Sequence, residues 1–101
     1  MAQRIIVYWR DIPAQVIVKA GRKNAKRQLP ERFEQAIDMA AMRSGASETD
    51  DYLADWRRAD PEPVEGDDLE QIAEAEAHRL DTEYDVERIK ALIANGGRAV
   101  T

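Results

Sequence analysis

Two short apolar runs near the start of the chain predict a pair of β-strands. Residues 4–9 (Arg-Ile-Ile-Val-Tyr-Trp) are β-branched and aromatic on both faces, so we expect this strand to run through the middle of a sheet. Residues 11–13 (Asp-Ile-Pro) interrupt the run, because proline has no amide to donate to a strand ladder. Residues 15–20 form a second apolar run that ends at Gly21. The five residues between the two runs predict a β-hairpin over residues 4–20.

The period of the apolar positions becomes helical at Pro30. One face of a helix over residues 30–44 collects the apolar side chains Phe33, Ile37, Ala40 and Ala41. Pro30 is typical of a first helical turn, and Ser44 with Gly45 supplies the end. The basic residues before Pro30 could extend this helix backwards, although a residue that precedes proline prefers extended geometry.

The segment after this helix allows two interpretations. The side chains from Tyr52 to Arg57 alternate in a way that is typical of an edge strand. The four-residue spacing of Tyr52 and Trp56 is equally typical of one helical turn. Because the prolines at positions 61 and 63 leave little length for a helix, we predict a strand over residues 51–58.

The acidic second half of the chain predicts two further helices. After a polar connector over residues 61–66, acids in the first turn and an apolar stripe indicate a helix over residues 67–80; the stripe consists of Leu69, Ile72, Ala73, Ala77 and Leu80. Thr82 or Asp85 could cap a third helix over residues 84–95, because both types accept hydrogen bonds from backbone amides. Two glycines at positions 96 and 97 end it.

These elements follow the order ββαβαα and predict an α+β fold, a small antiparallel sheet with helices packed on one face. The 101 residues suffice for a single domain over residues 1–101, and the 44% of hydrophobic residues can form a modest core. No apolar run reaches the length of a membrane helix, and no segment resembles a signal peptide. Cysteine is absent. We therefore expect a cytoplasmic protein without membrane association.

The net charge of −5 is distributed unevenly. Residues 1–27 carry seven Lys or Arg and one acid, whereas the remainder carries eight basic and nineteen acidic residues. The basic run over residues 19–27 could bind phosphate or an acidic surface, and its candidate anion-binding residues are Arg22, Lys23, Lys26 and Arg27. It could equally be a solvated loop that offsets the acidic helices. Because the whole chain is acidic, nucleic acid is the less favoured partner.

No arrangement of residues points to a catalytic, metal or cofactor site. His78 lies one helical turn from Glu74, but two ligands do not complete a metal site. Ser44 and Ser47 have no base linked to them by sequence, and no glycine cluster has the context of a nucleotide-binding loop. We therefore expect no catalytic residue, no metal and no cofactor.

Four of the six aromatic residues, Tyr8, Trp9, Tyr52 and Trp56, fall in the predicted strands. On a sheet covered on one side only, some of them would face away from the helices, where Trp and Tyr act as interface anchors. The alternative places both tryptophans in the core. Arg often accompanies aromatic residues at interfaces. The predicted partner-binding residues are Trp9, Arg10, Tyr52, Trp56, Arg57 and Arg58.

Three segments carry a family resemblance: residues 4–13 (Arg-Ile-Ile-Val-Tyr-Trp-Arg-Asp-Ile-Pro), residues 14–19 (Ala-Gln-Val-Ile-Val-Lys) and residues 51–58 (Asp-Tyr-Leu-Ala-Asp-Trp-Arg-Arg). They are similar to short bacterial proteins of the virulence factor domain family. In that family the domain occurs alone or attached to larger proteins, and stand-alone members often neighbour genes of folate- and corrinoid-dependent methyl transfer. The resemblance thus implies an accessory role in methyl transfer, which composition and spacing do not show.

We therefore predict a non-catalytic protein-binding or accessory domain. Its partner would be another protein or a second copy of the chain, met through the sheet face or a strand edge. The alternatives are a nucleic-acid-binding module that uses residues 19–27, and a small enzyme of unknown reaction that uses His78 or paired carboxylates.

Overall fold

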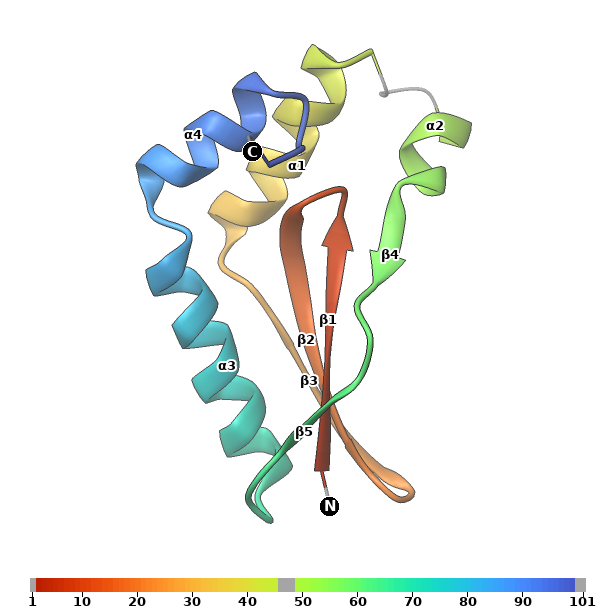
Figure 1. Ribbon diagram of the computed structural model, residues 1–101, viewed down its shortest axis with the longest axis vertical. Helices are drawn as coiled ribbons and strands as arrows, with labels where there is room; N and C mark the ends of the chain where they lie inside the picture. The colour runs from red at the N-terminus through yellow and green to blue at the C-terminus, as the bar shows by residue number, and fades with distance from the viewer. Residues whose placement is uncertain (1, 46–48, 100–101) are drawn as a thin grey trace.

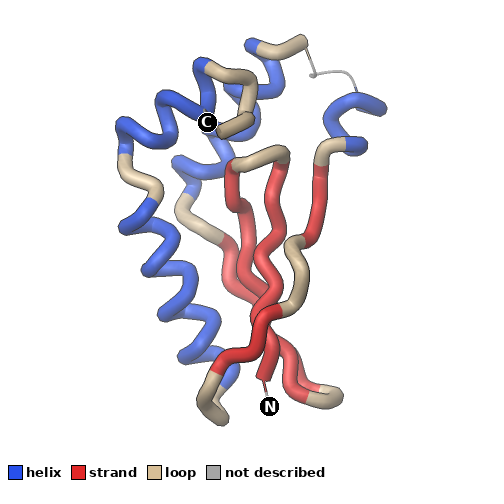
Figure 2. The backbone as a smooth tube through the Cα atoms, viewed as in Figure 1, coloured by secondary structure: helices blue, strands red, loops and turns tan. Residues whose placement is uncertain are grey.

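Five strands form one antiparallel sheet in the computed structural model, which describes residues 2–45 and 49–99. The strands are β1 (Ala2–Trp9), β2 (Ile12–Ala20), β3 (Lys23–Gln28), β4 (Trp56–Arg58) and β5 (Glu62–Val64). The order across the sheet is β3-β2-β1, and the far side of β1 pairs with β4 near its end and with β5 near its beginning. Strands β4 and β5 thus share the fourth position in the sheet (Figure 2).

Four helices accompany this sheet, namely α1 (Glu31–Arg43), α2 (Thr49–Ala54), α3 (Leu69–Glu83) and α4 (Val86–Ala94). Helix α3 lies along one face, where it contacts β2 and β3, and α4 packs on α1 (Figure 1). Helix α2 lies beside the end of the sheet at which β1 finishes and β4 begins. The predicted α+β fold with a small antiparallel sheet is confirmed.

The core lies between the sheet and the helices. Its largest fully buried side chains include Trp9, Phe33, Ile12, Ile37, Val16 and Val18. Helix α3 buries Leu69, Ala73, Ala77 and Leu80, which belong to the stripe predicted for it. No helix in the described part of the chain is long and apolar enough to cross a membrane.

The ends of the last two helices follow the sequence closely. Asp68 and Asp85 cap α3 and α4, because their carboxylates accept hydrogen bonds from the backbone amides of Gln71 and Arg88. Thr82, the other predicted cap, instead donates its hydroxyl to the carbonyl of His78 at 3.0 Å. After α4 the chain turns back through Gly96 and Gly97, both at positive φ, and passes close to Trp9.

The first hairpin is tighter than predicted. Strand β2 begins at Ile12, so Pro13 lies inside a strand, at an irregularity of the β1–β2 register between Val7 and Tyr8. Such a bulge tolerates a residue that cannot donate an amide to the ladder. The connection therefore shrinks to Arg10 and Asp11, and Arg10 takes a φ of 53°.

Three other predictions were wrong in detail. Residues 23–28, predicted as a loop or a helix extension, form β3, and the polar connector over residues 61–66 contains β5. The strand predicted over residues 51–58 is helix α2 followed by the short β4. The helical turn carries the backbone carbonyl of Tyr52 to the indole Nε1 of Trp9, which donates to it at 2.9 Å.

Candidate interaction surface

Strand register defines which side chains face away from the helices. Arg4 donates to Glu76 of α3 at 2.9 Å, so it lies on the helix side of β1, and its neighbours Gln3 and Ile5 face the other way. Directly paired residues share a face. The face without α3 therefore presents Gln3, Ile5, Val7, Gln15, Ile17, Lys19, Asn24, Lys26, Gln28, Arg58 and Pro63, and we call this set the open face.

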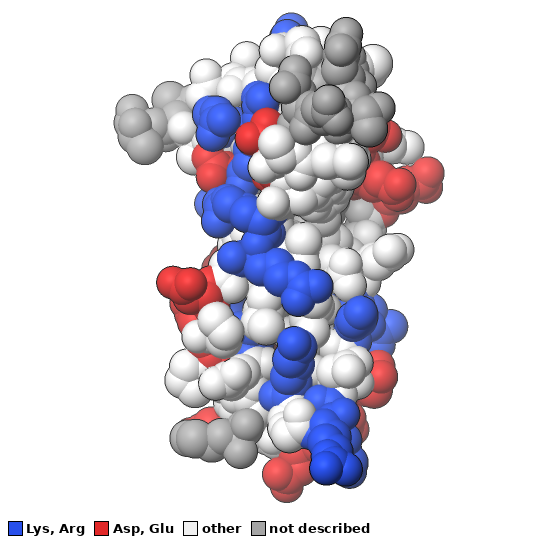
Figure 3. Space-filling model, turned by 90° about the vertical axis from the view of Figure 1, so that its right-hand side faces the viewer, with Lys and Arg blue, Asp and Glu red and all other residues white. Residues whose placement is uncertain are grey.

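The open face carries cations and amides but no carboxylate. Lys19, Lys26 and Arg58 are all exposed on it. Helix α3 covers the opposite side of the sheet in Figure 1, and Figure 3 shows Lys and Arg in a column down the side turned away from it, with most Asp and Glu at the margins. This surface therefore has a positive potential, although the whole chain carries a net charge of −5.

Several acidic residues on the sheet's other side have cationic partners. Glu76 of α3 accepts from both Arg4 and Arg79, and Glu83 accepts from Arg79. The guanidinium of Arg4 also pairs with Glu62 of β5. These carboxylates thus pair with cations on the α3 side of the sheet, and among the described residues no ion pair involves Lys19, Lys26 or Arg58.

The centre of the open face is apolar. Ile5 and Ile17 are direct cross-strand partners and are buried, yet they lie outside the cluster of buried residues beneath the helices. On the side of Ile17 opposite to Ile5, its direct cross-strand partner is Lys26 of β3. The aliphatic stem of a lysine can cover an apolar neighbour while its ammonium group stays in water. The small apolar centre is therefore covered, and the surface that this face presents to solvent is polar and cationic.

The strand edges are poor acceptors of another strand. Strand β3 is dominated by Lys, Arg and amide residues, which oppose edge-to-edge pairing. The opposite edge contains Pro61 and Pro63, which cannot donate to an incoming strand. The sequence predicted binding through either the sheet face or a strand edge. Of these two, the strand edges are the less suited to a partner.

Two of the predicted partner-binding residues, Trp9 and Arg10, make contacts within the fold. Trp9 is fully buried at 0% exposure, so it cannot reach a partner in this conformation. The side chain of Arg10 is 13% exposed and donates to Asp55 at 3.0 Å and to the carbonyl of Gly96 at 2.6 Å. Its guanidinium lies over the ring of Trp9 at 4.7 Å. Arg10 thus joins the first hairpin to α2 and the C-terminal turn.

Of the other four residues, Tyr52 belongs to α2, and Trp56, Arg57 and Arg58 form β4. Arg57 lies over the ring of Tyr8 at 4.6 Å and donates to Asp11 at 3.1 Å, on the side away from the open face. Arg58 lies on the open face. Tyr52 and Trp56 are half-buried, and their ring centroids are 5.8 Å apart. The structure therefore brings Tyr52, Trp56 and Arg58 near one surface and separates Arg57 from them.

The predicted anion-binding residues do not form one patch. Arg22 lies in the β2–β3 turn, and Lys26 lies on the open face. Lys23 and Arg27 point to the helix side, where the guanidinium of Arg27 lies 4.0 Å and 3.9 Å from the carboxylates of Glu70 and Glu74. The alternation of β3 therefore divides the basic run between two faces.

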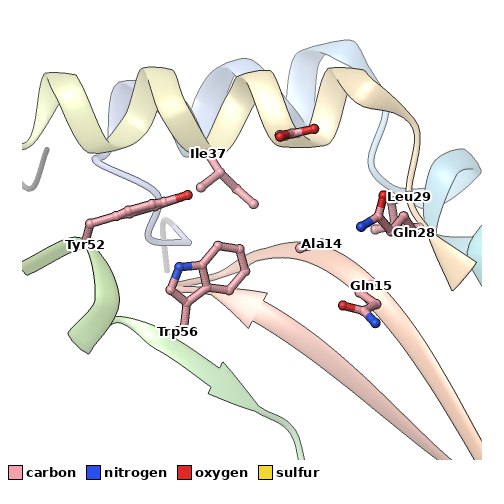
Figure 4. Close-up of a pocket in the computed structure, with 8 residues that line it drawn as sticks. Ala14, Gln15, Gln28, Leu29, Ile37, Tyr52 and Trp56 are labelled. Carbon is pink, nitrogen blue, oxygen red and sulfur yellow. The ribbon is translucent and has the colours of Figure 1, made fainter. Parts of the chain in front are cut away.

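A pocket of about 220 Å³ lies at the end of the open face, between α1, α2 and the first hairpin (Figure 4). Tyr52 and Trp56 line one wall, Ile37 and Leu29 contribute apolar surface, and the polar lining consists of Gln15, Gln28 and Glu34. Burial raises the pKa of the Tyr52 phenol above its ordinary value, and the carboxylates of Asp38 and Glu34 raise it further. The pocket therefore combines aromatic surface with negative potential.

The sequence did not reveal the amides and Glu34 as parts of a site. Gln15 and Gln28 come together only because β3 pairs with β2, and the sequence did not predict β3. Within residues 2–45 and 49–99, no group of three or more His, Asp or Glu could hold a metal ion. His78 is exposed on α3.

Comparisons with known proteins give one match. A family model described as "Virulence factor" matches residues 7–93, which is most of the chain. No curated protein and no solved structure shows significant similarity.

Proposed function

We propose that this chain, which belongs to the virulence factor family, is a non-catalytic binding domain that docks its open face on an acidic surface of a partner protein. The observation that carries the proposal is the carboxylate-free face on which Lys19, Lys26 and Arg58 are exposed. Complementary charge favours association of such a face with an acidic surface and sets its orientation.

Two features favour a protein partner over a nucleic acid. The aromatic pair that could stack on bases lies in a pocket with Glu34 on its wall, which repels phosphate. A net charge of −5 also opposes the long-range approach of a polyanion.

The family resemblance supplies the first partners to examine. It implies an accessory role beside enzymes of folate- and corrinoid-dependent methyl transfer. A non-catalytic domain fits an accessory role, because it would position or stabilise an enzyme without supplying reacting groups of its own. We therefore propose such an enzyme, with an acidic patch on its surface, as the partner.

The test compares capture of partners from the source cell by three tagged forms of the chain, each with and without nuclease. The variant Lys26→Glu/Arg58→Glu reverses two charges on the open face. The control Arg43→Glu/Lys90→Glu reverses two exposed charges on α1 and α4. We expect the first variant to lose roughly tenfold or more of the captured partner, and the control to retain it. Circular dichroism should be unchanged for both, since surface substitutions alter stability little.

Several results would contradict the proposal. Equal capture by all three forms would show that the open face takes no part in partner binding. Loss of the captured species on nuclease treatment would assign the face to a nucleic acid. Copurification of a methyl-transfer enzyme that the face variant no longer holds would support both the surface and the accessory role.

A further inference from the structure

Arginine side chains lie over four of the six aromatic rings of this protein. Arg10 lies over Trp9, Arg32 over Phe33, Arg57 over Tyr8 and Arg88 over Tyr84, with distances from the guanidinium carbon to the ring centroid between 3.9 Å and 4.7 Å. Among the described residues, the two rings without such a neighbour are Tyr52 and Trp56. These are the two rings that line the pocket at the end of the open face.

The pocket has the chemistry that an arginine side chain requires. The rings of Tyr52 and Trp56 offer π-faces on which a guanidinium can stack. Glu34 supplies a carboxylate, and the lining contains neither Lys nor Arg. The side-chain amide oxygens of Gln15 and Gln28 can accept from the remaining N–H groups, and the alkyl stem would meet Leu29 and Ile37.

We propose that this pocket binds the guanidinium group of an arginine supplied by the partner protein, an inference that rests on the proposed function. The pocket borders the open face, because Gln15 and Gln28 belong to both. A partner that covers the open face with acidic residues would therefore present one arginine at the edge of its acidic patch. That arginine fixes the orientation in which the two surfaces meet, since the opposite orientation would place a carboxylate beside Glu34.

The test titrates the ¹⁵N-labelled chain with N-acetyl-arginine methylamide and follows the indole N–H resonance of Trp56. The chain contains only two tryptophans, and Trp9 is fully buried, so Trp56 is the tryptophan that can touch the added ligand. The matched ligand is N-acetyl-citrulline methylamide, which has the same shape and no charge. We expect the arginine compound to shift the Trp56 resonance in a saturable manner and the citrulline compound to shift it much less.

Two substitutions in α1 test whether the carboxylate of Glu34 contributes to binding. Glu34→Gln should weaken binding of the arginine compound roughly two- to fivefold. Glu31→Gln, which changes an exposed residue of α1 outside the pocket, should leave it unchanged. Equal shifts with both ligands, no shift with either, or equal effects of the two substitutions would overturn the inference.

The same titration separates this inference from the proposed function, because it needs no partner. The variant Lys26→Glu/Arg58→Glu should still bind the arginine compound, and at least as tightly as the wild type, because it makes the surface beside the pocket more negative. Failure of the arginine compound to bind, with partner capture still dependent on the open face, would overturn the pocket assignment alone. A different outcome is a Trp56 resonance that shifts with protein concentration when no ligand is added. That result would show that a second copy of this chain fills the pocket, and would overturn the proposal that a partner protein supplies the arginine.

Discussion

Trp9→Ala should cost roughly 3–5 kcal/mol in the free energy of unfolding, enough to unfold much of a small domain of ordinary stability. The side chain is completely buried, and its indole donates to the backbone of Tyr52 at 2.9 Å. A methyl group at Gly97 would lie 2.7 Å from the indole, which shows how tightly the C-terminal turn packs on this ring. Urea unfolding followed by far-ultraviolet circular dichroism measures the loss.

Trp56→Ala is the matched control for this prediction. Trp56 is half-buried and packs at the edge of the core, where it lines the pocket, so its removal should cost less than half as much and leave the folded spectrum intact. Equal destabilisation by the two substitutions would show that Trp56 is a core residue, and would remove it from the proposed surface.

Arg10→Ala should cost roughly 1.5–3 kcal/mol, because it removes charge-assisted hydrogen bonds to Asp55 and to the carbonyl of Gly96. These bonds hold three separate parts of the chain at the end of β1. Arg57→Ala is the comparison, since that side chain is 50% exposed and its ion pair with Asp11 should contribute no more than about 1 kcal/mol. The urea midpoints of the two variants give the difference.

A different outcome would restore the original prediction for Arg10. If Arg10→Ala leaves stability unchanged and abolishes partner capture, Arg10 is a binding residue despite its small exposed fraction. If it lowers stability while the remaining folded protein still captures the partner, Arg10 is the structural connection described above.

The apolar pattern predicted the parts of the fold that the core stabilises. Residues 4–9 lie in the central strand β1, and the stripe of α3 is buried, because both segments repeat apolar residues at the period of their element. Strand β3 has only one apolar residue, Ala25, and forms because its backbone hydrogen-bonds to β2. The residue types of such an edge strand therefore give little indication that it is a strand.

The candidate surface was harder to predict because it depends on register. The sequence identified Tyr52, Trp56 and Arg58, but it could not distinguish Trp9 from Trp56, which lie opposite each other in β1 and β4. Their different burial follows from the position of Tyr52 and the C-terminal turn, both distant in sequence from Trp9. Similarly, Lys26 and Arg27 are adjacent in sequence yet point to opposite faces of the sheet.

The most direct test of the open face as the binding surface is a lysine-acetylation footprint of the partner complex. The lysines of the chain are Lys19, Lys23, Lys26 and Lys90. Peptide mass spectrometry compares their acetylation rates in the free and bound chain. We expect slower acetylation of Lys19 and Lys26 in the complex and an unchanged rate at Lys90 on α4. Protection of Lys90, with Lys19 and Lys26 as reactive as in the free chain, would contradict this expectation.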